Sequence, residues 1–171
     1  LEMGADIVVN TDGDNQYSGQ DIEKLISPII QKRADMVVGA RPIMKHKEFS
    51  FIKKLLQIFG SFVLRRLAKV DVRDTTSGFR AYNQQCCLSI NLKSKFSHCA
   101  ETLIQVGCSG LRVVSVDISV NNKTRASRLF KSIPQYIYKQ GRTIITMFVL
   151  YRPGPFFFSV GSLFIFVALV F

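Results

Sequence analysis

The sequence predicts an α/β fold built on a parallel sheet. The β-branched run Ile7-Val8-Val9 predicts a short strand over residues 6–10, of the kind that is buried within such a sheet. A helix is expected over residues 20–33, and the apolar residues 35–39 predict a second strand. Strand, helix and strand in this order form a βαβ unit, whose two strands run parallel to each other.

Capping residues mark the start of the first helix. Ser18, followed by Gly19, stands where an N-cap is expected, and Asp21 and Glu23 fall in the first turn. Later elements continue the alternation of helices and strands. We expect a long helix over 49–69, a polar turn over 71–78, a strand over 79–82, a helix over 98–106 that ends at Gly107, and a strand over 111–119.

The long helix over residues 49–69 has two interpretations. Its apolar residues recur at intervals of three and four, and Lys53, Lys54, Arg65 and Arg66 lie off that stripe. The helix either packs its apolar stripe in the core with a solvated basic face, or contacts a membrane or a phosphate group. The periodicity leaves both interpretations open.

The C-terminal residues predict contact with a membrane. Residues 130–151 read as an amphipathic helix with Lys and Arg beside an apolar face, which is typical of helices lying in a membrane interface. Arg152-Pro153-Gly154-Pro155 ends this helix, and residues 156–171 carry no charge. That run is shorter than the ~20 residues that span a bilayer, so we expect the start of a transmembrane helix. Cations before it, such as Arg142 and Arg152, predict that the preceding residues are cytoplasmic.

Composition favours anionic partners. The chain has 23 Lys and Arg against 12 Asp and Glu, a net charge of +11. Nucleic acid is not expected as the partner, because the cations are scattered among apolar stretches and no nucleic-acid motif accompanies them. The four cysteines form no Cys-x-x-Cys pair, and we expect reduced thiols.

The Asp-x-Asp motif in Asp12-Gly13-Asp14-Asn15-Gln16 predicts a metal site at the end of the first strand. Ligands bind in the crevice at the carboxyl ends of strands in open α/β sheets. Oxygen donors placed there suit Mg²⁺ or Mn²⁺, which are usually held by one or two carboxylates and by substrate phosphates. The motif therefore indicates a metal-held phosphate compound.

Two other motifs overlap the same residues. An EF-hand loop would begin at Asp12, but its sixth position requires Gly and here is Tyr17, and a strand precedes it. An aspartyl-phosphate phosphatase would have a hydroxyl residue two positions after the second Asp, where this chain has Gln16.

Three further clusters could surround a phosphate. Gly39-Ala40-Arg41 places an arginine at the end of the second strand, where its planar guanidinium suits phosphate. Asp74-Thr75-Thr76-Ser77-Gly78-Phe79-Arg80 offers hydroxyls and a glycine that permits close backbone approach. Lys123-Thr124-Arg125-Ala126-Ser127-Arg128 is a cationic loop. Glu101, near the start of the helix over 98–106, either complements the helix N-terminus or acts as a general base.

In these four motifs the chain resembles the polyprenyl-phosphate glycosyltransferases, the dolichyl-phosphate mannose synthase-like members of glycosyltransferase family 2. The resemblance implies a GT-A fold, a Rossmann-like α/β sheet, and inverting transfer of a sugar from a GDP- or UDP-sugar to a polyprenyl or dolichyl phosphate. Asp12, Asp14 and Gln16 would hold Mg²⁺ or Mn²⁺, with Asp12 also at the donor diphosphate. Arg41 and Lys53 would face the acceptor phosphate. Arg125 and Arg128 would lie on a loop over the donor diphosphate.

The resemblance also divides the chain. Residues 1–129 are expected to be the C-terminal portion of a GT-A catalytic domain whose nucleotide-binding half precedes them, so that this piece alone would be inactive. Residues 130–152 would be the interface helix, in contact with membrane lipids, and residues 153–171 a truncated transmembrane segment. Two alternatives stay open: a processive polysaccharide synthase of the same superfamily, although the chain has no Trp for that group's Gln-x-x-Arg-Trp segment, and an inactive module that binds anionic lipid.

Overall fold

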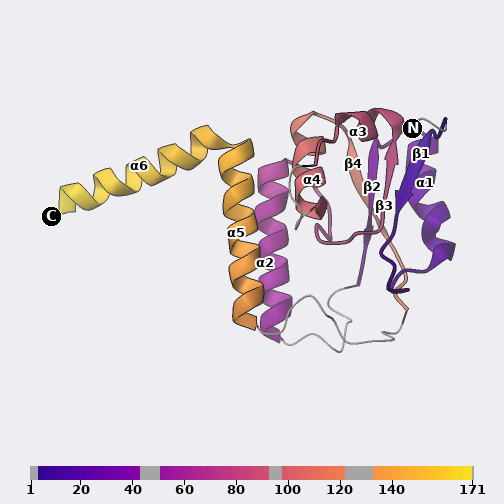
Figure 1. Ribbon diagram of the computed structural model, residues 1–171, viewed down its shortest axis with the longest axis horizontal. Coiled ribbons are helices and arrows are strands. Elements are labelled where there is room, and N and C mark those ends of the chain that lie inside the picture. The colour runs from indigo at the N-terminus through magenta and orange to yellow at the C-terminus, as the bar shows by residue number, and fades with distance from the viewer. Residues whose placement is uncertain (1–3, 43–50, 93–97, 122–132, 171) are drawn as a thin grey trace.

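The computed structural model describes residues 4–42, 51–92, 98–121 and 133–170. Four strands form one mixed sheet in the order β1-β3-β2-β4 (Figure 1). They are β1 (Ile7–Asn10), β2 (Met36–Ala40), β3 (Arg80–Asn83) and β4 (Val113–Asp117). Strand β3 is antiparallel to both β1 and β2, whereas β2 and β4 pair in parallel.

The strands β1 and β2 run in the same direction, as predicted, since both are antiparallel to β3, but the strand order corrects their expected pairing in a βαβ unit. Strands β1 and β2 are not neighbours, because β3 lies between them and bonds to both: Ala81 is opposite Val9 on one side and Val37 on the other. Apolar periodicity predicts which residues are buried, but it does not specify which strand lies beside which. All five residues of β2 are buried between two neighbours. In β1, which pairs only with β3 among the described residues, Val8 is 37% exposed.

Helices cover both faces of the sheet and divide its core in two. Val37 points to the face covered by η1 (Gly19–Asp21) and α1 (Ile22–Ile30), where it packs in a cluster with Leu25 and Phe79. Met36 and Val38 point to the opposite face and pack with residues of α2 (Phe51–Ala68), α3 (Gln84–Ser89) and α4 (His98–Cys108). This alternation follows from the two-residue period of a strand.

Local sequence features explain several helix boundaries. The Ser18 hydroxyl accepts a 3.3 Å hydrogen bond from the backbone N–H of Gln20, which confirms the predicted cap. The helix expected to end at Gly107 instead continues to Cys108. Gly107 lies where a Cβ atom would be only 2.0 Å from the carbonyl oxygen of Ala68. Its role is therefore to let α4 approach α2 closely, not to end the helix.

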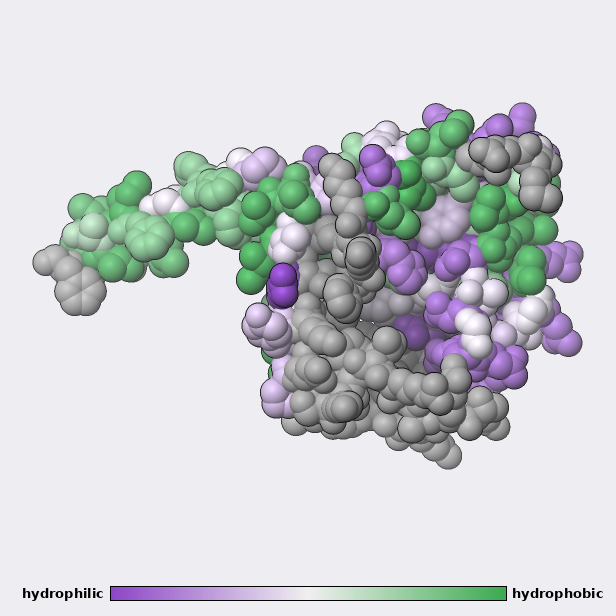
Figure 2. Space-filling model, in the orientation of Figure 1, coloured by the Kyte–Doolittle hydropathy of each residue, from purple (hydrophilic) through white to green (hydrophobic). Residues whose placement is uncertain are grey.

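The two C-terminal helices differ in their surroundings. Helix α5 (Ile133–Tyr151) packs against α2 and α4, whereas α6 (Pro153–Val170) projects away from the rest of the chain (Figure 1). Figure 2 shows α6 as an apolar arm, and none of its residues is buried. Pro153 begins α6, as the predicted break requires. Among the described helices, α6 alone is long and apolar enough to cross a membrane.

Candidate active site

The loop after β1 is joined to the loop that precedes β3. The Asn10 amide, at the end of β1, donates a 2.8 Å hydrogen bond to the Gly78 carbonyl. Asp12 lies against the same residue: a Cβ atom on Gly78 would be 2.7 Å from both carboxylate oxygens. A side chain at position 78 would therefore displace the Asp12 carboxylate from this position.

The rest of the Asp-x-Asp motif forms a tight, solvent-facing turn. The backbone N–H of Gln16 donates to Oδ1 of Asp14 at 3.0 Å, and Asn15 has a positive φ of 57°. Asn121, which follows β4, donates from its side chain to the Asn15 carbonyl at 3.1 Å and from its backbone to the Gln16 carbonyl at 2.9 Å. Asp12 and Asp14 are both exposed, so their oxygens are accessible to a ligand.

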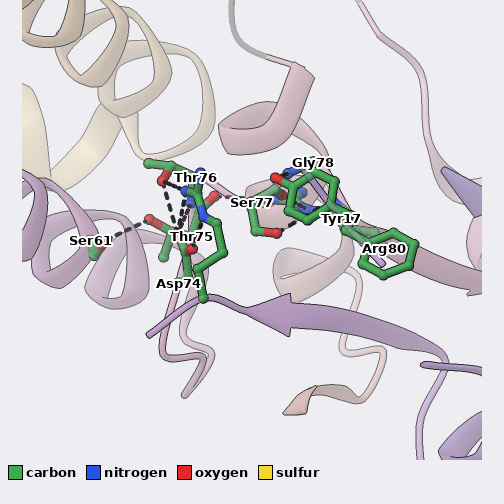
Figure 3. Close-up of polar contacts among 10 residues, drawn as sticks. Tyr17, Ser61, Asp74, Thr75, Thr76, Ser77, Gly78 and Arg80 are labelled. Atoms are coloured by element: carbon green, nitrogen blue, oxygen red, sulfur yellow. Dashed lines mark hydrogen bonds and ion pairs between the residues drawn. The ribbon is translucent and has the colours of Figure 1, made fainter. Parts of the chain in front are cut away.

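Tyr17 anchors this turn in the core. Its ring stacks on Phe79 with centroids 5.0 Å apart, and its hydroxyl accepts a 3.3 Å hydrogen bond from the Gly78 N–H (Figure 3). Burial raises the pKa of Tyr17, and the nearby positive charge of Arg41 opposes that rise. The phenol therefore stays neutral beside Asp12, and its aromatic ring fixes the end of the turn.

Arg41 is held by the loop that precedes β3. Its Nε donates to Asp74 Oδ2 at 2.7 Å, and its Nη2 donates to Asp74 Oδ1 at 3.2 Å and to Thr76 Oγ1 at 2.8 Å. Asp74 is fully buried and Arg41 is 13% exposed at its side chain. Burial alone would raise the pKa of Asp74, but Arg41 and Thr76 hold that pKa below its usual value; the same pairing raises the pKa of Arg41. The guanidinium is thus fixed in orientation.

Arg80 organises the same loop from inside the protein. This side chain is fully buried, and it donates to the carbonyls of Ser77 and Cys99 at 2.7 Å each, to Thr75 at 2.8 Å and to the Thr102 hydroxyl at 2.7 Å. The sequence analysis grouped Arg80 with a cluster of residues expected around a phosphate. The structure assigns it a different task, which is to join the loop to α4.

The N-terminal end of α4 adds two residues that the sequence analysis missed. His98 Nε2 and Cys99 Sγ are 3.3 Å apart. The pKa of His98 is raised, chiefly by this contact, and the pKa of the Cys99 thiol is lowered, because His98 and Arg80 outweigh the effect of burial. The Asp12 carboxylate acts electrostatically on both groups, so the Asp-x-Asp turn and the start of α4 face the same region. No sequence motif signalled this pair.

Glu101 lies in the first turn of α4, and it is fully buried. Its Oε1 accepts from the Tyr151 hydroxyl at 3.2 Å and from Gln105 Nε2 at 3.3 Å. Gln105 also donates to the Tyr151 hydroxyl at 2.7 Å. Glu101 therefore joins α4 to the last residue of α5.

The remaining predicted site residues are described only in part. Lys53 lies in α2, but its side chain is outside the described residues. Arg125 and Arg128 both lie outside the described residues. The described part of the chain contains no group of three or more His, Cys, Asp or Glu that could hold a metal by itself. Mg²⁺ bound through one or two carboxylates and substrate phosphates needs no such group, so the exposed Asp12 and Asp14, with the half-buried Gln16, fit an ion of that kind.

Comparison with known proteins links this geometry to glycosyltransferases. The chain is 37% identical over 123 residues, 68% of its length, to the UDP-N-acetylglucosamine–dolichyl-phosphate N-acetylglucosaminyltransferase of Methanococcus voltae, of which it covers 49%. It is 26% identical over 125 residues, 70% of its length, to the undecaprenyl-phosphate mannosyltransferase of Micrococcus luteus, of which it covers 51%. The chain thus spans about half the length of these curated relatives.

The fold resembles that of glucosyl-3-phosphoglycerate synthase from Mycobacterium tuberculosis. A structure of that enzyme with phosphoglyceric acid matches with a TM-score of 0.60 at 15% identity, over 86% of this chain and 50% of that one. A second structure, with Mn²⁺, UDP-glucose and glycerol 3-phosphate, matches with a TM-score of 0.55 at 13% identity over the same shares of 86% and 50%. At this level of identity the match confirms the expected GT-A type of fold.

The family model for glycosyl transferase family 2 matches residues 2–88. That range contains the Asp-x-Asp turn, Arg41 and the loop that positions them, the three parts that the geometry brings together. The chain therefore belongs to glycosyl transferase family 2.

Proposed function

We propose that the whole protein transfers a sugar from a nucleotide sugar to a polyprenyl or dolichyl phosphate on the cytoplasmic face of a membrane. One observation carries the proposal: a single loop, residues 74–78, contacts both the Asp-x-Asp turn and Arg41. A metal-binding turn and a fixed guanidinium side by side suit a reaction in which a diphosphate leaves and a phosphate attacks. The relatives named for dolichyl-phosphate and undecaprenyl-phosphate acceptors support the same acceptor class.

Asp12, Asp14 and Gln16 would hold Mg²⁺ or Mn²⁺ together with the donor diphosphate. The structure of the synthase from M. tuberculosis, which has the same type of fold, contains Mn²⁺ and UDP-glucose, and this supports a divalent metal and a nucleotide-sugar donor. When bound, the ion offsets the negative charge that develops on the departing nucleoside diphosphate. Arg125 and Arg128 would add positive charge near the same diphosphate.

Arg41, together with Lys53, would position the acceptor phosphate. Asp74 and Thr76 fix the guanidinium of Arg41, so little conformational freedom is lost when a phosphate binds to it. A lipid phosphate is already anionic at neutral pH, and it needs positioning and charge screening more than it needs a general base. The burial of Glu101 against Tyr151 is consistent with a reaction that has no carboxylate base.

The chain would be organised in three parts. Residues 1–129 would be a C-terminal portion of the catalytic domain, which is supported by the sheet and its covering helices. Residues 130–152 would lie at the membrane interface, and residues 153–171 would enter the bilayer. The exposed apolar surface of α6 supports the last assignment.

Transfer of radiolabelled sugar to lipid phosphate, measured in the whole protein, tests this proposal. Asp14→Ala should lower the rate by about 10²-fold or more, because an electrostatic contact to the leaving group is lost. Glu101→Gln should retain much of the activity, since the amide oxygen can still accept from Tyr151. Asp6→Ala, an exposed carboxylate before β1, is the matched control and should leave the rate unchanged. Equal losses for Asp14→Ala and Glu101→Gln would refute the mechanism without a base.

The size of the labelled product and the binding of the donor separate the alternatives. A processive synthase would release a polymer, whereas the proposed enzyme yields one sugar per lipid. An inactive lipid-binding module would bind neither donor nor metal. Metal-dependent binding of a nucleotide sugar, lost in Asp14→Ala, would exclude that module.

A further inference from the structure

An open cavity of about 320 Å³ lies where α6 leaves α5. Three helices meet there: Phe62, Val63 and Leu67 come from α2, Phe148 from α5 and Pro155 from α6. Arg66 and Arg152 complete the lining. The cavity therefore combines an apolar floor with two guanidinium groups, and it is separate from the loops around Asp12 and Arg41.

The two arginines give this cavity a positive charge that no described residue of its lining offsets. Within the described residues, the ion pairs of the protein involve neither Arg66 nor Arg152, and no carboxylate lines the cavity. Guanidinium groups bind phosphate through paired N–H donors, which makes a phosphate a well-matched occupant. Charge alone would not distinguish a free phosphate from a lipid headgroup.

The surrounding surface favours a lipid. On α2, Leu55, Ile58, Phe59 and Phe62 are all at least 45% exposed, and their spacing places them on one face of the helix. Exposed apolar patches of this kind mark interaction surfaces. Arg152 immediately precedes α6, the candidate membrane span, so the cavity would lie at the level of the lipid headgroups. An occupant there needs an anionic head and an apolar tail.

We propose that this cavity binds the phosphate headgroup of an anionic membrane phospholipid, with Arg66 and Arg152 on the phosphate and Phe62 and Phe148 against the acyl chains. The lipid would join α2 of the catalytic part to the point where α6 enters the bilayer. This site is distinct from that of the acceptor lipid, and it does not depend on the transfer reaction.

Native mass spectrometry of the detergent-solubilised protein, titrated with phosphatidylglycerol, tests this site. We expect one tightly held lipid in the wild type, and a dissociation constant raised about tenfold or more in the double variant Arg66→Gln/Arg152→Gln. The control Lys32→Gln/Arg33→Gln removes two exposed cations beyond α1, on the other face of the sheet, and should bind as the wild type does. Equal affinities in the two double variants would overturn the proposal.

Further variants and competing ligands identify the occupant of the cavity and exclude a folding defect. Arg66→Lys/Arg152→Lys, with an unchanged thermal melt, should recover part of the affinity. Phe62→Gln should weaken phosphatidylglycerol binding several-fold, and inorganic phosphate should compete poorly. Displacement by inorganic phosphate at the same concentration as phosphatidylglycerol would make this a free-anion site. Preferential displacement by polyprenyl phosphate would make it part of the acceptor site, and either result would overturn the assignment.

Discussion

Replacing Asp74 with asparagine should destabilise the protein and loosen Arg41. Asp74 is fully buried and accepts from Arg41 at 2.7 and 3.2 Å. Losing one partner of a buried ion pair costs about 3–5 kcal/mol, because the other charge is left without compensation. Arg41 keeps its contact with Thr76 and is 13% exposed, so we expect the lower end of that range, about 3 kcal/mol in the free energy of unfolding.

The pH dependence makes this prediction specific. Arg41 and Thr76 outweigh burial and hold the folded-state pKa of Asp74 below its ordinary value of 3.8. A group whose pKa is lowered by folding adds stability that is present above the unfolded-state pKa, and this stability disappears as pH falls through the folded-state pKa. The stability gap between the wild type and Asp74→Asn should therefore be full at neutral pH and should narrow only below about pH 3.8.

Urea unfolding followed by circular dichroism, at a series of pH values in a nonionic detergent, measures that gap. Asp117→Asn is the matched control: Asp117 pairs with Arg73 at 2.6 Å, but their side chains are 75% and 68% exposed. An exposed pair of this kind contributes at most about 1 kcal/mol. A buried ion pair is refuted if Asp74→Asn lowers the free energy of unfolding no more than Asp117→Asn does. It is also refuted if the stability gap between the wild type and Asp74→Asn is unchanged down to about pH 2.

Two glycines give further predictions. Gly107→Ala should destabilise the protein by about 1–3 kcal/mol in urea unfolding, because its Cβ would meet a carbonyl of α2 at 2.0 Å. Gly60 in α2 has open space where a Cβ atom would lie, so Gly60→Ala should be neutral or should stabilise the protein by up to about 1 kcal/mol. A larger loss of stability in Gly60→Ala than in Gly107→Ala would contradict this prediction. Gly78→Ala should displace the Asp12 carboxylate and weaken Mn²⁺ binding by the whole protein about 10-fold, measured by titration calorimetry; unchanged affinity would remove Asp12 from the metal site.

Local patterns in the sequence were sufficient to predict most of the elements. Strands β1, β2, β3 and β4, helices α1, α2 and α5, and the break before α6 lie within a few residues of their expected places. Short helix α3 was missed, although Asn83 caps it by accepting from the Cys86 N–H at 2.7 Å. The predicted position of each element rests on residues that lie close together in the chain, so local sequence carries that information.

The family was also accessible from sequence, because Asp12, Asp14 and Gln16 form a motif within five consecutive residues. Their arrangement with Arg41 was not, since Arg41 and Asp74 are separated by 33 residues. Nor did the sequence distinguish the structural roles of Arg41 and Arg80. Arg41 is a partly accessible guanidinium held in place by Asp74, whereas Arg80 is a fully buried connector between loop and helix.

By itself, the sequence determined where most of the strands and helices form, that an Asp-x-Asp turn follows β1, and that an apolar helix follows α5. These properties depend on periodicity, capping and the donor types within a few consecutive residues. Only the tertiary structure decided that β3 lies antiparallel between β1 and β2, that Gly78 gives Asp12 its place, and that Glu101 binds Tyr151. Such contacts join residues distant in the chain, and they form only once the sheet and helices have packed.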